Sequence, residues 1–468
     1  MIAAAAVTVL LGAGGAAAAY LTFLQPEDEA PPATREAPDP PEAALPTPTP
    51  APKPKPKPKP DTFKWRHYGY SVDHRRSFKP PASFRGPFLP VWKRKAPALL
   101  EFPPVMSNGA LFQLADNGQL ASLRKKNGKV LWKKKLGRLA ASSPALADGR
   151  VYVTLLDGGR SGRGRIVALR QRNGKRRWSR MLPSRSESSP LVHGKRLYFG
   201  SENGTLYCLD ARSGKVKWTY RAAGAIKGSP TYAHGKLYFG DYGGRVQAVR
   251  AKNGRRVWSS AGSGRFYATA AVAGRRVYIG STTGRVYAFS TRNGKLRWSH
   301  QTGRYVYASA AISRVKGWGP TVFVGSYDGR FYALSARTGR VRWTYNSGGK
   351  ISGSATVIGR VVYFADLGHR RTIGLGTKTG RVSFRRSQGA YDPVISDGKH
   401  LYLTGNHTLT ALRPLKPHGK AARQRAARRK AARKRAARRA HRRALRKRAA
   451  RRAARKRAAR RQARSARR

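Results

Sequence analysis

Aromatic residues recur along this chain at a spacing close to 40 residues, each a few positions after a Gly-Lys or Gly-Arg pair. They are separated by 46, 40, 40, 40, 45 and 41 residues, and they are Trp132, Trp178, Trp218, Trp258, Trp298, Trp343 and Phe384. A period of this length predicts a repeat architecture, in which each unit buries its apolar face against the next.

A small residue lies ten positions before each of these aromatics, and a glycine lies six positions after each small residue. The small residues are Ser122, Ala168, Cys208, Ala248, Ala288, Ala333 and Gly374. The glycines are Gly128, Gly174, Gly214, Gly254, Gly294, Gly339 and Gly380. We interpret the aromatics as docking residues, because a flat ring needs the space that a small residue and a glycine leave.

Each unit contains four short β-rich runs. In one unit they are residues 218–220, 230–233, 236–239 and 245–249, separated by turn pairs such as Gly243-Gly244. Four short strands per unit are typical of a propeller blade. Trp92 precedes Trp132 by 40 residues, and Ala411 repeats the small position without a tryptophan after it. We therefore predict an all-β, eight-bladed β-propeller over residues 61–415, with its last blade closed by its first strand.

This spacing of a small residue, a glycine and a tryptophan resembles the tryptophan-docking motif of the PQQ-like (quinoprotein alcohol dehydrogenase-like) propeller repeat family. The opening residues 65–69, with Asp73 and Arg76, also resemble the segment before the first blade in that family. The family's enzymes bind a quinone and calcium on the propeller axis, with an Asp base and an adjacent Cys-Cys pair. The resemblance here is to its non-catalytic branch, which includes the β-barrel-assembly lipoprotein.

The residue inventory does not suit catalysis. The only cysteine is Cys208, which occupies a small-residue position and is expected to be packed and inert. Residues 61–415 contain 14 acids, spread singly along the sequence as at Glu101 and Asp366. We therefore predict no catalytic residue, no cofactor and no metal site. A PQQ-dependent dehydrogenase is the least favoured alternative.

The N-terminal residues have the composition of a membrane segment followed by a spacer. Residues 2–24 carry no charge, and 23 residues of helix span about 34 Å, enough to cross a hydrocarbon core of about 30 Å. We predict an uncleaved anchor over residues 1–24, with a cleaved signal peptide as the alternative. Residues 25–60 are rich in proline, end in four Lys-Pro pairs, and are expected to form a disordered, extended linker.

The excess of positive charge predicts a polyanionic partner, because the chain contains 97 Lys and Arg residues and only 20 Asp and Glu residues. Residues 416–468 are almost entirely Ala, Arg and Lys, with 26 basic residues from Lys420 onward and no acid. This tail is expected to be disordered alone and to bind a wall polymer or anionic lipid if it lies outside the cell. If it lies in the cytoplasm, nucleic acid is the expected partner.

Residues just before the innermost strand of each blade are candidates for a binding surface, because propellers bind ligands near their axis. The candidate axial residues are Glu187, Lys227, Phe266, Tyr267, Tyr305 and Tyr307. The alternative is that the tyrosines only cover the end of the core and that Glu187 and Lys227 form a solvated pair.

We therefore predict a membrane-tethered, extracytoplasmic scaffold of the cell envelope, with no enzymatic activity. Its predicted partners are the membrane, an unidentified protein and the polyanion of the tail. The rival hypothesis is a cytoplasm-facing, membrane-tethered protein that binds nucleic acid.

Overall fold

The structure is a computed structural model, and it describes residues 61–156, 162–391 and 394–415. The chain divides into two compact units, Met1–Pro58 and Lys59–Arg468, and every described residue belongs to the second. The predicted anchor (1–24), linker (25–60) and basic tail (416–468) lie outside the described residues. In the part of the chain that is described, no helix has the length and apolarity of a membrane span.

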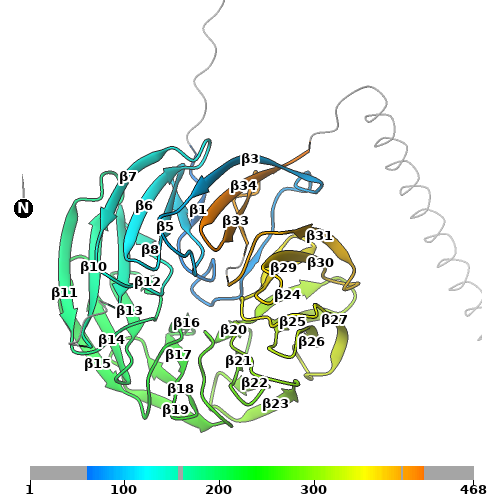
Figure 1. Cartoon of the computed structure of the whole chain (residues 1–468). Helices are drawn as coiled ribbons and strands as arrows, with labels where there is room; N and C mark the ends of the chain where they lie inside the picture. The colour runs from blue at the N-terminus through cyan, green and yellow to red at the C-terminus, as the bar shows by residue number, and fades with distance from the viewer. Residues whose placement is uncertain (1–60, 157–161, 392–393, 416–468) are drawn as a thin grey trace, which may run out of the picture. The chain divides into compact units, whose positions relative to one another are not determined.

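Eight sheets are arranged around a central axis, which confirms the predicted eight-bladed, all-β propeller (Figure 1). In each blade the strands run antiparallel from the axis outward. Blade 1 consists of β4 (Val105–Ser107), β5 (Ala110–Leu114), β6 (Gln119–Arg124) and β7 (Val130–Lys135), and blade 2 of β8 (Ala145–Ala147), β9 (Arg150–Leu155), β10 (Gly164–Arg170) and β11 (Arg176–Leu182). Blade 3 consists of β12 (Leu191–His193), β13 (Arg196–Gly200), β14 (Thr205–Asp210) and β15 (Val216–Arg221). Blade 4 consists of β16 (Thr231–Ala233), β17 (Lys236–Gly240), β18 (Arg245–Arg250) and β19 (Arg256–Ala261).

The second half of the ring repeats the same arrangement. Blade 5 consists of β20 (Ala271–Ala273), β21 (Arg276–Gly280), β22 (Arg285–Ser290) and β23 (Leu296–Gln301), and blade 6 of β24 (Ala311–Val315), β25 (Gly319–Gly325), β26 (Arg330–Ser335) and β27 (Val341–Asn346). Blade 7 consists of β28 (Thr356–Ile358), β29 (Val361–Asp366), β30 (Arg371–Gly376) and β31 (Val382–Arg386). Blade 8 consists of β32 (Ile395–Ser396), β33 (Leu401–Gly405), β34 (Thr408–Pro414) and β3 (Phe88–Lys95).

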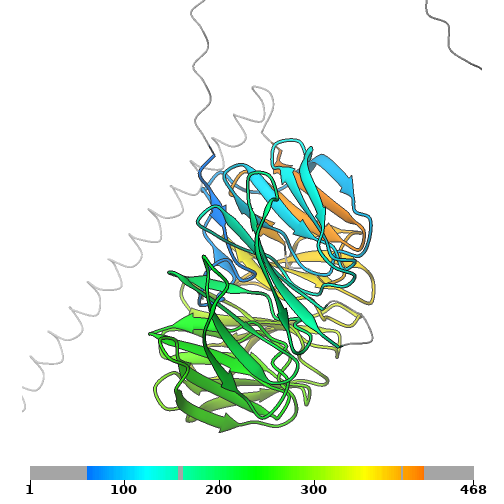
Figure 2. The same ribbon diagram turned by 90° about the vertical axis from the view of Figure 1, so that its left-hand side faces the viewer.

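Blade 8 joins the two ends of the propeller. Its outer strand β3 comes from before blade 1 and pairs antiparallel with β34, which places Trp92 opposite Ala411. The blue β3 and the orange β34 lie side by side in both views (Figures 1 and 2). This closure leaves no open sheet edge between the first and last blades, as the sequence predicted.

The indole of each docking tryptophan lies against a glycine of the next blade. A Cβ atom added at Gly174 would lie 2.8 Å from Cε3 of Trp132, and one at Gly214 would lie 2.7 Å from Cδ2 of Trp178. The Trp132 indole N–H also donates to the Gln171 carbonyl at 2.8 Å. The small residue has a different place from the one expected: it lies opposite its tryptophan within the same sheet, as Cys208 does opposite Trp218. Apolar clusters between adjacent blades form the rest of the core.

A segment before the first blade circles the axis and holds seven blades together. We call residues 64–78 the lead-in ring. It begins as β1 (Lys64–Trp65), which pairs with β4 of blade 1, and ends as β2 (Ser77–Phe78), which pairs in parallel with β28 of blade 7. Between these ends it accepts hydrogen bonds from the innermost strands of blades 2 to 6, from the N–H groups of Leu146, Val192, Tyr232, Val272 and Ile312. The ring therefore closes one end of the axial channel.

Candidate functional site

The candidate site lies at the other end of the axis, where the chain enters each innermost strand. Glu101, Glu187, Lys227, Tyr267 and Tyr307 come from five different blades, yet each stands three residues before a Pro or Ala that opens the innermost strand region. All five line one cavity of about 70 Å³. We call this cavity, with Tyr68 and Tyr391 as further lining residues, the axial mouth.

An ion-paired triad occupies one side of the axial mouth. The Lys227 Nζ atom lies 2.8 Å from Glu187 Oε1 and 3.1 Å from Oε1 of Glu202, which lies in the β13–β14 turn. Burial alone would lower the pKa of Lys227, but its bonds to the two carboxylates raise the pKa overall. Burial raises the pKa of Glu187, and Lys227 opposes this effect. The predicted pair is therefore a half-buried triad and not a solvated pair.

Glu101 is the acid of the mouth that has no cation beside it. Within the described residues, its carboxylate has neither an ion pair nor a hydrogen bond. Burial, followed by the charges of Glu187 and Asp116, raises the pKa of Glu101 to about 6. A carboxylate in this position gains from a cation that enters the cavity.

Tyrosine rings form a wall of the mouth next to the triad. The Tyr267 and Tyr307 ring centroids lie 5.3 Å apart, edge to face, and Tyr307 packs in the same way on Tyr327 at 5.0 Å. The Tyr267 hydroxyl donates to Glu187 Oε2 at 3.4 Å, and Lys227 Nζ lies 5.7 Å from the centroid of the Tyr242 ring. Aromatic faces beside carboxylates are a typical environment for a bound ammonium or guanidinium group.

The lead-in ring supplies the floor of the mouth. The Tyr68 hydroxyl lies 3.0 Å from Ser354 Oγ, and the Arg76 guanidinium stacks on the other side, 3.8 Å from the Tyr68 ring centroid. Arg76 is only 1% exposed. The lead-in ring therefore covers the mouth on the side where Tyr68 lies.

The structure brings together four of the six candidate axial residues: Glu187, Lys227, Tyr267 and Tyr307. Tyr305 does not line the cavity but stands beside Tyr307, 46% exposed, with its ring centroid 5.8 Å from that of Tyr307. The prediction that Phe266 belongs to the axial binding surface is wrong. Phe266 is fully buried in the apolar cluster between blades 4 and 5, because neighbouring residues of an extended chain point in opposite directions and Tyr267 takes the axial side.

Sequence reasoning missed Glu101 and Glu202. Glu101 stands alone among uncharged residues in the sequence, but it has the same three-residue offset from Pro104 as Glu187 has from Pro190. Extending the alignment to blade 1 would have found it. Glu202 lies in the β13–β14 turn, at the position equivalent to Tyr242 of blade 4 and Tyr327 of blade 6, so an alignment of these turns would have related it to the tyrosines around the mouth.

The axial residues do not fit the quinone cofactor of the family's enzymes. The cavity of about 70 Å³ is far below the 300–1,000 Å³ that is typical of sites for small organic ligands. Cys208 is fully buried in blade 3, where burial raises its pKa to about 11. No cluster of three or more His, Cys, Asp or Glu residues that could hold a metal occurs in the part of the chain described.

Comparisons with known proteins agree with this architecture. BamB from Moraxella catarrhalis is similar at 19% identity and a TM-score of 0.58, covering 71% of this chain and 99% of that one. A quinohemoprotein alcohol dehydrogenase from Pseudomonas putida HK5 is similar at 13% identity and a TM-score of 0.63, covering 76% and 82%. The computationally designed Ika8 protein is similar at 13% identity and a TM-score of 0.59, covering 70% and 99%. At these identities the likeness shows the fold alone.

No curated protein sequence matches the chain. One family model does, over residues 89–195, 162–317 and 309–438, and its description is outer membrane protein assembly factor BamB. These matches extend over more than half of the chain and over all eight blades. The protein therefore belongs to the PQQ-like propeller family described as outer membrane protein assembly factor BamB.

Proposed function

We propose that this protein is a non-enzymatic scaffold of the cell envelope, and that its axial mouth binds a cationic side chain of a protein partner. The observation that carries the proposal is the position of three glutamates. Glu101, Glu187 and Glu202 are the only glutamates between residues 61 and 415, in a chain with a formal net charge of +77. Two of them line the axial mouth, and the third is bonded to its lysine.

The chemistry of the mouth favours a side chain over a free cofactor. A space of about 70 Å³ holds the head group of a lysine or arginine. The wall of tyrosines and the Glu101 carboxylate, which has no cation beside it among the described residues, provide the contacts that such a head group needs. The exposed Tyr305 beside the mouth supplies an aromatic surface on which the partner's backbone can rest. Family membership supports a scaffold role for this site, since the family's description names an assembly factor.

Site-specific crosslinking in cells tests this proposal. A photo-crosslinking amino acid at Tyr305 is expected to yield one predominant adduct with an envelope protein, and the adduct is expected to disappear in the variant Glu101→Gln/Glu187→Gln. Leu296 on the outer strand β23, 53% exposed, is the matched control position and is expected to give no such adduct. An adduct that persists in the double variant, or that forms equally from Leu296, would contradict the proposal.

The same proposal assigns roles to the terminal segments. Residues 1–24 tether the propeller to a membrane, residues 25–60 act as a spacer, and residues 416–468 bind a wall polymer or anionic lipid. Protease added to intact cells, with the outer membrane permeabilised if one is present, is expected to remove the tail. Full protection of the tail would favour the cytoplasm-facing, nucleic-acid-binding alternative, without bearing on what the axial mouth binds.

A further inference from the structure

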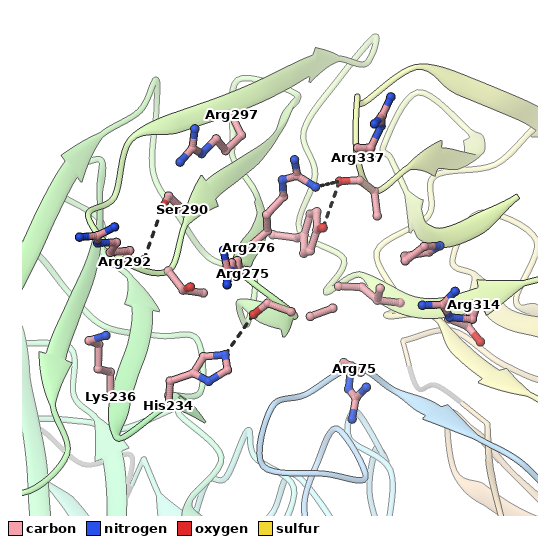
Figure 3. A pocket seen from close by; sticks show the side chains of 18 residues that line it. Arg75, His234, Lys236, Arg275, Arg276, Ser290, Arg292, Arg297, Arg314 and Arg337 are labelled. Atoms are coloured by element: carbon pink, nitrogen blue, oxygen red, sulfur yellow. Dashed lines mark hydrogen bonds between the residues drawn. The ribbon is translucent and has the colours of Figure 1, made fainter.

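The face opposite the axial mouth carries a deep basic groove between blades 4, 5 and 6. It is formed by the innermost hairpins and by the turns between the third and fourth strands, and it has a volume of about 1060 Å³. Eight cationic side chains line it, and no acid does; six of them are Arg275, Arg276, Arg292, Arg297, Arg314 and Arg337 (Figure 3). We call this surface the arginine groove.

Seven of the eight cations of the groove have no acidic partner within the described residues. Among the eight, Arg75 is the one with an acidic partner, Asp73, at 2.6 Å. Arg276 is held in place by donating to the Ala336 carbonyl of blade 6 at 3.4 Å. Arg275, Arg292 and Arg314 are exposed and have no acid beside them within the described residues. The guanidinium groups of these arginines repel one another, and an anion bound between them would relieve that repulsion.

The arrangement in space favours an extended ligand. Figure 3 shows Arg75 rising from the lead-in ring below the groove, while Arg314 and Arg337 reach it from blade 6. Arg75 and Arg314 also line a second groove of about 940 Å³, which continues over blades 6 and 7 and carries Lys79, Arg85 and Arg360 but no acid. A chain of anionic groups can follow both grooves, whereas a compact anion would fill only part of one.

Side-chain chemistry narrows the class of anion. Guanidinium groups bind phosphate oxygens through paired N–H donors, which suits arginine better than lysine for phosphate. Stacking of nucleic-acid bases requires exposed aromatic faces, but the single tyrosine of the arginine groove, Tyr278, is 2% exposed and donates its hydroxyl to the Ala336 carbonyl. The groove therefore offers many phosphate contacts, and His234 is its one exposed aromatic ring among the described residues.

We propose that the arginine groove binds a phosphate polymer that lacks nucleobases, such as linear polyphosphate or a polyol-phosphate chain. The phosphates lie along the groove against guanidinium groups of blades 5 and 6. This site is separate from the basic tail and from the axial mouth. One protein can thus hold a protein partner at one end of its axis and a phosphate polymer at the other.

Arginine-selective labelling of the full chain tests the proposal, because it reports on individual arginines of the groove separately from those of the basic tail. Phenylglyoxal modification is followed residue by residue by mass spectrometry, with and without inorganic polyphosphate. Modification of Arg275 and Arg314 is expected to slow about fivefold or more, because bound phosphate occupies their N–H groups. Arg172 and Arg177 of blade 2 stand at the positions equivalent to Arg292 and Arg297 and are expected to be unaffected.

A pair of matched variants sharpens the test. Arg292→Gln/Arg297→Gln is expected to remove most of the protection of Arg275 and Arg314, whereas Arg172→Gln/Arg177→Gln, with the same change of net charge, is expected to leave it intact. A glycerol-phosphate polymer in place of polyphosphate distinguishes the two sources of phosphate. Absence of protection, equal protection at Arg172, or equal protection by single-stranded DNA of matched charge would overturn the proposal.

Discussion

Trp92 lies opposite Ala411 in the outermost strand pair of blade 8, so two residues from the two ends of the propeller sequence complete one docking unit. The Trp92 indole also crosses to blade 1, where its N–H donates to the Lys125 carbonyl at 2.9 Å and its ring covers Gly128. Trp92 therefore holds blade 8 against blade 1, at the point where the two ends of the propeller sequence meet.

Replacing Trp92 by alanine is expected to destabilise the propeller by about 2–4 kcal/mol, because the substitution removes a half-buried indole and an inter-blade hydrogen bond. Urea unfolding followed by tryptophan fluorescence measures the loss. Trp318, also half-buried but on the β24–β25 turn, is the matched control, and its replacement is expected to cost at most about 1 kcal/mol. Equal effects of the two substitutions would show that closure through Trp92 is not special.

Substitutions at two glycines of blade 3 distinguish the stability lost through the docking contact from the stability lost through backbone strain. Gly214 and Gly194 both have positive φ, +73° and +58°, but a Cβ at Gly214 would meet the Trp178 ring at 2.7 Å, whereas one at Gly194 meets nothing within 4 Å. Gly194→Ala is expected to cost about 1 kcal/mol from strain alone, and Gly214→Ala about 2–3 kcal/mol. Thermal unfolding of both variants checks this, and a difference near zero would contradict the docking role.

The fold was largely predictable from the sequence, because the constraint that creates it is local and repeated. In blades 1 to 7 the aromatic residue, glycine and small residue lie within ten residues of one another, so alignment predicts the repeat, and the unpaired Trp92 and Ala411 predict the closure. The lead-in ring was not predictable in the same way. It contacts the blades mostly through backbone carbonyls, as at Arg66 and Val72, and such contacts leave no pattern in the side chains.

The candidate site was predictable only where residues share a register. Lys227 and Tyr267 could be placed together because they occupy the same position in adjacent blades. Phe266 was placed wrongly, since a shift of one residue in an extended strand exchanges the axial side for the core. The arginine groove combines hairpin residues such as Arg275 with turn residues such as Arg337, and only the three-dimensional structure shows that these meet.

Binding of a cationic group at the axial mouth is expected to strengthen as pH rises from 5 to 7. The raised pKa of Glu101, about 6, means that this carboxyl is neutral below that value and charged above it. Titration of binding against pH, with an arginine-containing peptide as probe, measures the effect. Glu101→Gln is expected to bind weakly and to lose most of this dependence. A wild-type affinity that does not change between pH 5 and 7 would argue against a role for Glu101.

Acid is expected to destabilise the propeller through the histidines of the lead-in ring. Burial lowers the pKa of His67 to about 4 and that of His74 well below its usual value. The folded pKa lies below the unfolded one, so the unfolded chain binds the proton first and stability falls as pH drops from about 6.5 toward 4. For His67 alone the loss approaches about 3 kcal/mol.

Urea unfolding at pH 7.0 and 5.0 measures this loss. The experiment is best done in the Glu101→Gln variant, because the raised pKa of Glu101 acts in the opposite direction over the same range. Its contribution to stability is present below about pH 4.5 and is lost as pH rises through about 6. A protein that is as stable at pH 5.0 as at pH 7.0 would show that the ring histidines do not remain buried and neutral.

Recognition of a cationic side chain by the axial mouth can be tested with peptides. Its most direct test is the affinity of the full chain for a short peptide with one arginine between uncharged residues, compared with the same peptide containing citrulline, which has the same shape but no charge. The arginine peptide is expected to bind about tenfold more tightly, and this preference is expected to be lost in Glu101→Gln. Equal affinity of the wild-type protein for the two peptides would show that the mouth does not recognise the positive charge.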